Sequence, residues 1–211
     1  MKNNKSKPQY RWEECYAKLV LESLFPERFF QLEFADKPDL QNRVSDMGIE
    51  VTTAVPEREK KLDSLYSKLE NSQGKAEQRE RYKNTISRLG GIYLDEGIAF
   101  NWADYDDPQK RYSAFEQKLK KLNGGGYTMF DKQYIFITDK SMCSSNQLEA
   151  INAELSNIQA YYSSRFDSVF LYFFGGALFE FNLRPGKLVR YTVDDVMGLV
   201  EEAYNLSQGV T

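Results

Sequence analysis

Residues 36–40 read Asp-Lys-Pro-Asp-Leu and residues 48–52 read Gly-Ile-Glu-Val-Thr, and these two stretches together decide the predicted fold. The second stretch has β-branched residues on both sides of Glu50, a pattern that predicts a β-strand entered through a glycine. Because side chains alternate along a strand, Glu50 is expected to point away from the face that carries its apolar neighbours. We expect Asp39 to lie on an adjacent strand and to face Glu50.

Two carboxylates in such close approach repel each other unless a cation lies between them. Magnesium prefers hard oxygen ligands, and proteins commonly hold it with one or two carboxylates, water and phosphate oxygens of the substrate. Asp39 and Glu50 therefore predict a Mg²⁺ site that also accepts Mn²⁺. Each residue alone has an ordinary alternative: Asp39 forms a turn after Pro38, and Glu50 faces solvent on its strand.

A Pro-Asp pair followed by a lone Glu inside an apolar strand resembles the PD-(D/E)XK nuclease superfamily. The resemblance implies an α/β fold with a restriction-endonuclease-like core, in which helices flank a mixed central β-sheet. It also implies magnesium-dependent endonuclease activity on the phosphodiester bonds of DNA. Asp39 and Glu50 would be metal ligands, with the backbone carbonyl of Val51 as a third. The chain departs from the motif at Thr52, where the family has a lysine.

A lysine from another element is the predicted substitute for the motif lysine, which helps to activate water and to offset charge on the phosphate. Lys118 lies on the same stripe of its predicted helix as Phe115, Leu119 and Leu122. We therefore predict that the Lys118 amine lies close to Glu50. The alternative is a lysine stem packed on the core with its amine in water.

The first predicted helix adds a third candidate acid. Glu13 falls within the apolar arc of this helix, and an acid in that position needs a polar partner. Members of the family often carry a glutamate on this helix beside the metal, so Glu13 is predicted as an accessory ligand or water-orienting residue. Glu14 is the second candidate, and a pair between Glu13 and Lys18 is the ordinary alternative.

Composition narrows the chemistry further. The 211 residues include no histidine, which excludes Ser-His-Asp hydrolases, His-Glu-x-x-His metalloproteases and nucleases with an imidazole base. Cys15 and Cys143 lie far apart in the sequence and form no zinc or disulfide motif, which favours a reducing cytoplasm. No stretch is typical of a signal peptide or a membrane span.

The predicted organisation is a flexible tail over residues 1–9 and one domain over 10–211 with a helical insertion around 57–90. The expected elements are a helix over 10–25, strands over 29–34, 39–44 and 48–55, a helix over 57–89 interrupted near 71–74, short strands at 92–94 and 98–100, a helix over 108–122, a strand over 134–138, a helix over 145–162, a hairpin over 168–183 and a helix over 193–206 that begins at a Thr192 cap.

Three functions remain open from the sequence. The first is a magnesium-dependent nuclease acting on nucleic acid, with DNA as the expected partner. The second is a degenerate nuclease fold that binds nucleic acid or a protein, with Thr52 marking lost chemistry. The third is an interaction protein whose fourteen tyrosines and fourteen phenylalanines supply contact area. Basic residues concentrate in 57–90 and 108–123 despite a net charge of -3, which fits either a polyanion-binding face or solvated helices.

Overall fold

The computed structural model groups the chain into two compact units. The main unit comprises Met1–Ala54 and Arg111–Thr211, and the inserted unit is Val55–Lys110. The predicted helical insertion at 57–90 falls inside the inserted unit, and the predicted tail at 1–9 lies outside the described residues. The residues that the structure describes are 10–72, 75–94, 97–99, 108–140, 145–173, 175–184 and 186–209.

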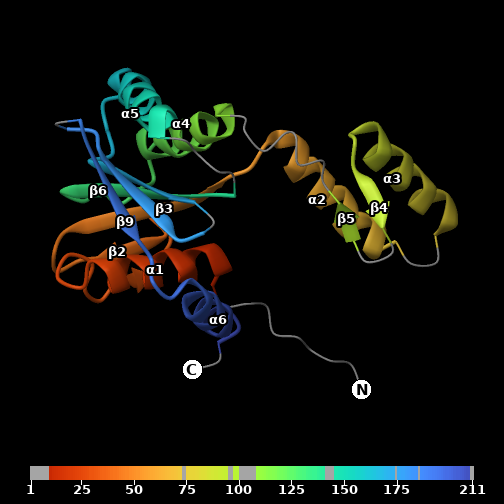
Figure 1. The fold of residues 1–211 in the computed structure, drawn as a ribbon, viewed down its shortest axis with the longest axis horizontal. Coiled ribbons are helices and arrows are strands. Elements are labelled where there is room, and N and C mark those ends of the chain that lie inside the picture. Colours follow the sequence, from red (N-terminus) through yellow and green to blue (C-terminus); the bar gives the residue numbers. More distant parts are fainter. Residues whose placement is uncertain are drawn as a thin grey trace. The chain divides into compact units, whose positions relative to one another are not determined.

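A seven-stranded mixed sheet forms the centre of the main unit (Figure 1). In spatial order its strands are β1 (Glu33–Phe34), β2 (Leu40–Asn42), β3 (Met47–Ala54), β6 (Lys132–Asp139), β7 (Ser168–Phe173), β8 (Ala177–Asn182) and β9 (Lys187–Thr192). The three central strands β3, β6 and β7 are parallel, and every other neighbouring pair is antiparallel. The predicted mixed α/β sheet is therefore confirmed.

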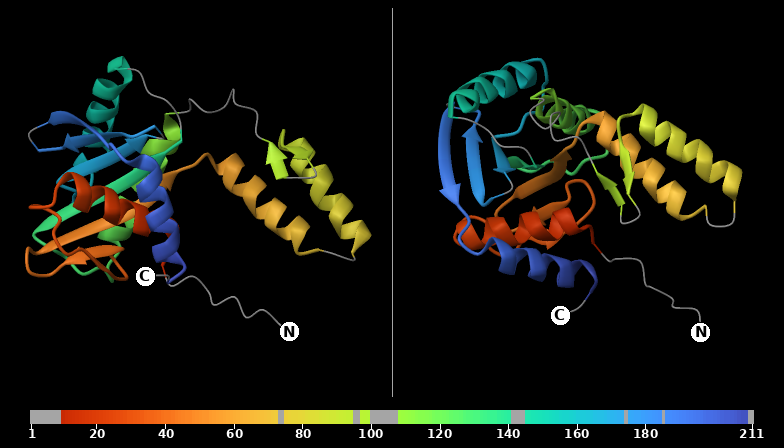
Figure 2. Two further views of the ribbon diagram at one scale, coloured as in Figure 1. Left: turned by 60° about the horizontal axis from the view of Figure 1, so that its bottom comes forward. Right: turned by 45° about the vertical axis from the view of Figure 1, so that its right-hand side comes forward.

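Helices cover both faces of this sheet. Figure 1 shows α4 (Gln109–Asn123) and α5 (Ser145–Ala160) above the sheet, and α1 (Trp12–Leu24) and α6 (Val196–Ser207) below it. The right-hand view of Figure 2 shows the same three layers. Parallel neighbours need long crossover connections, and α5 supplies the crossover between β6 and β7. The helices thus hide both faces of the central strands from water.

The alternation of side chains along β3 divides its residues between two hydrophobic cores. Ile49 and Val51 pack against α1 in the lower core, whereas Ala54 belongs to the upper core with the apolar stripe of α4. Glu50 is four positions before Ala54 on the same strand, so the two side chains share a face and Glu50 points toward α4. Glu50 therefore points away from Ile49 and Val51, as predicted, but the face that it enters is a second buried core and not a solvent-facing side.

The N-terminal region has fewer strand residues than its sequence predicts. Residues 29–32 form a turn, and strand structure is limited to Glu33–Phe34. Gln31 adopts a φ of 54°, which a strand cannot accommodate. Near the C-terminus, β9 was not expected at all. The last helix begins at Val196 with Asp195 as its cap, which accepts a hydrogen bond from the Gly198 amide at 3.0 Å, so the predicted Thr192 cap is wrong.

The predicted hairpin over 168–183 forms as strands β7 and β8 around a tight glycine turn. Gly176 has a φ of +88°, and a Cβ atom added there would lie 2.9 Å from the Val196 side chain. A side chain would therefore strain the backbone and collide with the start of α6. This glycine serves both the turn and the close approach of α6.

The inserted unit has its own elements and a small core. Helices α2 (Glu57–Glu70) and α3 (Ala76–Arg88) accompany a two-stranded ribbon of β4 (Ile92–Leu94) and β5 (Gly97–Ala99). The break between the two helices lies where the sequence predicts it. Among the described residues of this unit, the buried hydrophobic cluster consists of Leu62, Leu69 and Ile86.

Two further findings bear on the whole chain. Cys15 is buried and unbonded, and burial raises the pKa of its thiol to about 11, so it is an unreactive core residue, whereas Cys143 lies outside the described residues. Among the described helices, none combines the length and apolar character needed to cross a bilayer.

A buried ion pair joins the start of α4 to the end of β6. Arg111 and Asp139 are 1% and 0% exposed, and the guanidinium also lies over the Phe173 ring. We expect Asp139→Ala to lower the free energy of unfolding by about 3–5 kcal/mol, because the guanidinium loses a charged partner inside the core. Urea unfolding would measure this loss. Glu77→Ala, which removes an exposed pair with Arg81, should change little, and equal effects of the two variants would contradict the prediction.

Candidate functional site

The register of β2 and β3 brings the two predicted carboxylates together. Leu40 pairs with Ile49 in this antiparallel ladder, so the next position places Asp39 opposite Glu50. Opposite residues of antiparallel strands point to the same face. Asp39 also accepts a hydrogen bond from the Val51 amide at 2.7 Å, which extends the ladder past the end of β2 with a side chain. Both carboxylates therefore lie on one face of the sheet, as the sequence predicts, and α4 covers that face.

Lys118 of α4 lies between the two carboxylates. Its Nζ is 3.1 Å from Oδ2 of Asp39 and makes a short ion pair with Oε2 of Glu50. The lysine side chain is 12% exposed, because Phe115 and Leu119 on the same stripe are fully buried and hold the helix against the sheet. The amine has the position predicted for the displaced lysine. The cation expected between the carboxylates is thus, in this structure, the ammonium group itself.

Glu50 is the most deeply buried member of the cluster, at 1% exposure. Loss of hydration raises the pKa of its carboxyl group; the positive charge of Lys118 opposes this rise, and the negative charge of Asp39 adds to it. Its Oε1 atom has no hydrogen-bond partner among the described residues. The nearby Tyr127 hydroxyl lowers the pKa of Glu50, although it does not make a hydrogen bond of normal geometry to Oε1.

An open cleft of about 480 Å³ gives access to this cluster. Asp39 and Lys118 line it, and Tyr127 contributes the phenol ring beside them. Burial and the charge of Glu50 raise the pKa of Tyr127, so its hydroxyl keeps its proton. The residues that line the cleft are Arg11, Asp36, Lys37, Asp39, Lys118, Lys121, Gly124, Gly125 and Tyr127.

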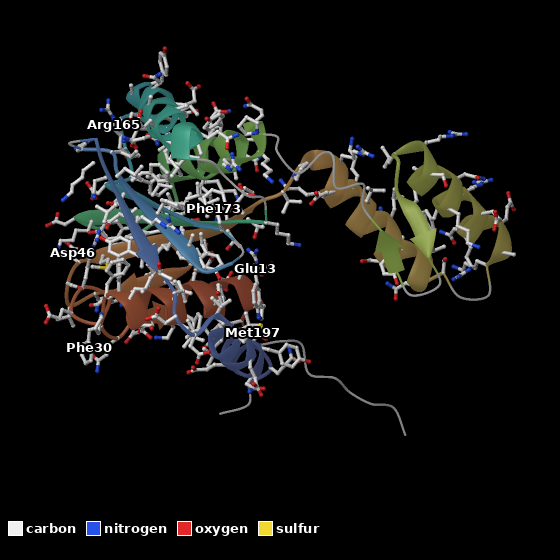
Figure 3. The ribbon with its side chains drawn as sticks, in the orientation of Figure 1. Glu13, Phe30, Asp46, Arg165, Phe173 and Met197 are labelled. Carbon is white, nitrogen blue, oxygen red and sulfur yellow. The ribbon has the colours of Figure 1, made fainter. Side chains whose placement is uncertain are left out.

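The structure does not bring Glu13 to the carboxylate pair. Figure 3 shows it on α1, which packs on the opposite face of the sheet from Glu50. Within the described residues its only ion pair is with Arg11, at 3.8 Å, and its side chain is 35% exposed. Glu14, the second candidate, lies nearer: its side chain is 13% exposed, and the charge of Asp39 contributes to a raised pKa after burial. Of these two acids of α1, Glu14 is thus the one whose charge interacts with that of Asp39.

The donor set fits a magnesium ion in its chemistry. Glu50 presents a buried carboxylate oxygen without a partner among the described residues, and Asp39 lies opposite it. Val51 directs its amide to Asp39, and a strand residue directs its carbonyl to the same side as its amide, so this carbonyl also faces Asp39. The described residues contain no group of three or more acidic, histidine or cysteine side chains suited to a metal. Two carboxylates suffice for magnesium, which retains several waters.

Tyr127 was missed by the sequence analysis. It comes directly after the glycines at 124–126 that end α4, so its distance from Lys118 along the chain is small. The only sequence feature that could have indicated Tyr127 is its place after a glycine-rich helix end, and many surface loops have a tyrosine in such a place. Only the packing of α4 onto β3 shows that this loop borders the carboxylates.

Comparisons of the chain with protein-family models, curated proteins and solved structures find no match. The geometry of the cleft and the order of the elements are therefore the observations that bear on function.

Proposed function

We propose that this protein is a magnesium-dependent nuclease that hydrolyses phosphodiester bonds of DNA. One observation carries the proposal: Asp39, Glu50 and Lys118, from separate parts of the chain, converge beside an open cleft that Asp39 and Lys118 line. Two carboxylates and one lysine are the groups that metal-assisted phosphodiester hydrolysis uses. All three are also the residues that the sequence predicts for this chemistry.

The order of the elements supports a restriction-endonuclease-like core. One helix, α1, precedes three antiparallel strands β1, β2 and β3, and the helix α4 leads into β6, which pairs with β3 in parallel. A helix, three strands, helices and then a further strand is the order that the resemblance implies. Fold alone does not carry the activity, because one architecture hosts many functions.

In this proposal Asp39, Glu50 and the Val51 carbonyl hold Mg²⁺, for which Mn²⁺ can substitute. The chemistry that such an ion would supply is polarisation of the phosphate and activation of water. Lys118 takes the role of the motif lysine, whose sequence position is occupied by Thr52. It supplies a positive charge to offset the negative charge that develops on the phosphate. In the structure the same ammonium pairs with both carboxylates and keeps the buried Glu50 from being an unpaired charge.

The alternative is a catalytically degenerate nuclease fold that binds nucleic acid or a partner protein. The observation that favours it is the position of Lys118, whose ammonium already pairs with both carboxylates. A permanent internal ion pair would make a metal unnecessary. Thr52 at the motif lysine position agrees with this alternative.

A cleavage assay separates the two functions. Purified protein should nick or cut supercoiled plasmid DNA with Mg²⁺ or Mn²⁺ and should not do so with EDTA, because both the nucleophile and the leaving group depend on the ion. Agarose gel electrophoresis measures the products. Salt-dependent DNA binding without cutting in either metal would favour the degenerate fold.

Metal binding gives a readout that does not depend on activity. We expect Mn²⁺ at about 100 times its Kd to stabilise the wild-type protein by about 2.7 kcal/mol, because the ion binds only the folded state. The shift in Tm measured with and without Mn²⁺ tests this. Glu50→Gln should lose most of the shift, whereas Glu116→Gln, on the outer side of α4, should keep it. An equal shift in both variants would place the ion elsewhere.

A further inference from the structure

The cleft carries three cations that the proposed chemistry does not use. Arg11 precedes α1, Lys37 lies in the loop before β2, and Lys121 lies in the last turn of α4. All three line the same cleft as Asp39 and Lys118. We call Arg11, Lys37 and Lys121 the basic rim. Segments far apart in the sequence thus place positive charge around one opening.

The charges of the basic rim are weakly compensated. The Arg11 guanidinium lies 3.6 Å from the Glu14 carboxylate and 3.8 Å from that of Glu13, and the Lys37 amine lies 3.9 Å from the Asp36 carboxylate. The Arg11 and Lys37 side chains are both more than half exposed. Lys121 forms no ion pair within the described part of the chain. Exposed pairs at such distances contribute little and exchange easily for another anion. The rim cations are therefore available to a ligand.

Lys120 is a natural contrast to Lys121. It is the preceding residue of α4, it is also exposed, and its amine lies 3.0 Å from the Glu116 carboxylate. It does not line the cleft. The helix therefore carries one lysine that is paired on its outer side and one that is directed to the opening.

The backbone beneath the rim is held in place and leaves room for a ligand. The Thr128 amide donates a hydrogen bond to the Lys37 carbonyl at 3.2 Å, which ties the loop after α4 to the loop before β2. Gly125 has a φ of +82°, and a Cβ atom added there would meet nothing within 4 Å. Glycine is suited to this conformation, and without a side chain it lets a phosphate approach the backbone.

The lining disfavours an apolar ligand. Among the described residues of the cleft wall, Tyr127 is the single aromatic side chain, and no aliphatic side chain accompanies it. Sites for apolar small molecules and the centres of protein interfaces are rich in such groups. Cations around a polar opening are instead typical of phosphate recognition.

We propose that the basic rim binds backbone phosphates of duplex DNA on the two sides of the phosphodiester at the candidate centre. This proposal rests on the proposed function, because the centre defines which phosphate lies between the flanking ones. The rim contacts position the strand without reading its sequence. Their contribution to the affinity is electrostatic, so it decreases as the salt concentration rises.

The test measures binding without cleavage. A fluorescein-labelled 20-base-pair duplex is titrated with full-length protein in EDTA, and anisotropy gives Kd from 50 to 200 mM NaCl. Lys121→Gln and Lys37→Gln should each weaken binding about three- to tenfold at 50 mM salt. Each should also make the slope of log K against log salt shallower by about 0.9. Lys120→Gln should match the wild type.

The outcomes distinguish the rim from the nuclease. If Lys121→Gln and Lys120→Gln bind alike, the rim proposal is overturned, even where the wild-type protein cuts DNA. No binding of the duplex by the wild type at 50 mM salt overturns it as well. If the wild type binds but does not cut with Mg²⁺, and Lys121→Gln and Lys37→Gln still weaken binding, the rim stands while the hydrolytic function fails.

Discussion

Glu50→Gln is expected to reduce magnesium-dependent DNA cleavage by about a thousandfold or more, equivalent to roughly 4 kcal/mol of transition-state stabilisation. Glu50 supplies the buried carboxylate oxygen that has no partner among the described residues, and an amide is a far poorer ligand for magnesium. Asp39→Asn should have an effect of the same order, because it removes the other carboxylate. Single-turnover cleavage of a labelled duplex measures both rates.

These variants should remain folded because each keeps the main contacts of the site. Relief of repulsion between the two carboxylates is not that reason, because Lys118 already lies between them. The amide side chains have the same shape as the carboxylates that they replace. In either variant Lys118 still has one carboxylate as an ion-pair partner. The side-chain oxygen of asparagine at position 39 can still accept the hydrogen bond from the Val51 amide. Circular dichroism and urea unfolding check this. Glu50→Gln cutting at the wild-type rate would place the chemistry at other residues.

Lys118→Met is expected to have opposite effects on cleavage and on metal affinity. Cleavage should fall by about 10³-fold, because the variant lacks the positive charge that stabilises the phosphate in the transition state. Mn²⁺ should bind at least about tenfold more tightly, because the ion no longer has to displace an ammonium from between Asp39 and Glu50. Isothermal titration calorimetry measures the affinity, and DNA binding in EDTA should change little.

The matched control for Lys118→Met is Lys120→Met. It removes a lysine from the same turn of α4 that pairs with Glu116 outside the cleft, so cleavage and Mn²⁺ affinity should both stay at wild-type values. If Lys118→Met leaves cleavage unchanged, the lysine is a counter-ion without a catalytic role. If it leaves Mn²⁺ affinity unchanged, the ion does not share a position with the ammonium, and the binding-only function ranks first.

Local chemistry was enough to predict most of the elements of the main unit and the three residues that converge at the cleft. Glu50 alternates with two β-branched residues, so its orientation relative to them follows from the pleat of a strand. Lys118 shares a helical stripe with Phe115 and Leu119, so its direction follows from the helical repeat. These inferences depend on one element at a time, and periodicity within one element is encoded in adjacent residues.

Long-range packing determined the rest. Strand β9 has exposed and half-buried residues with little apolar alternation, and its pairing with β8 is what makes it a strand. The choice between Glu13 and Glu14 depends on how α1 is rotated against a sheet whose faces are both covered, and helical periodicity leaves that rotation uncertain by one residue. The position of Lys118 between two carboxylates, and of Tyr127 beside them, follows from the docking of α4 on β3. A tertiary contact depends on the relative placement of elements that are distant in the chain, and no local pattern specifies that placement.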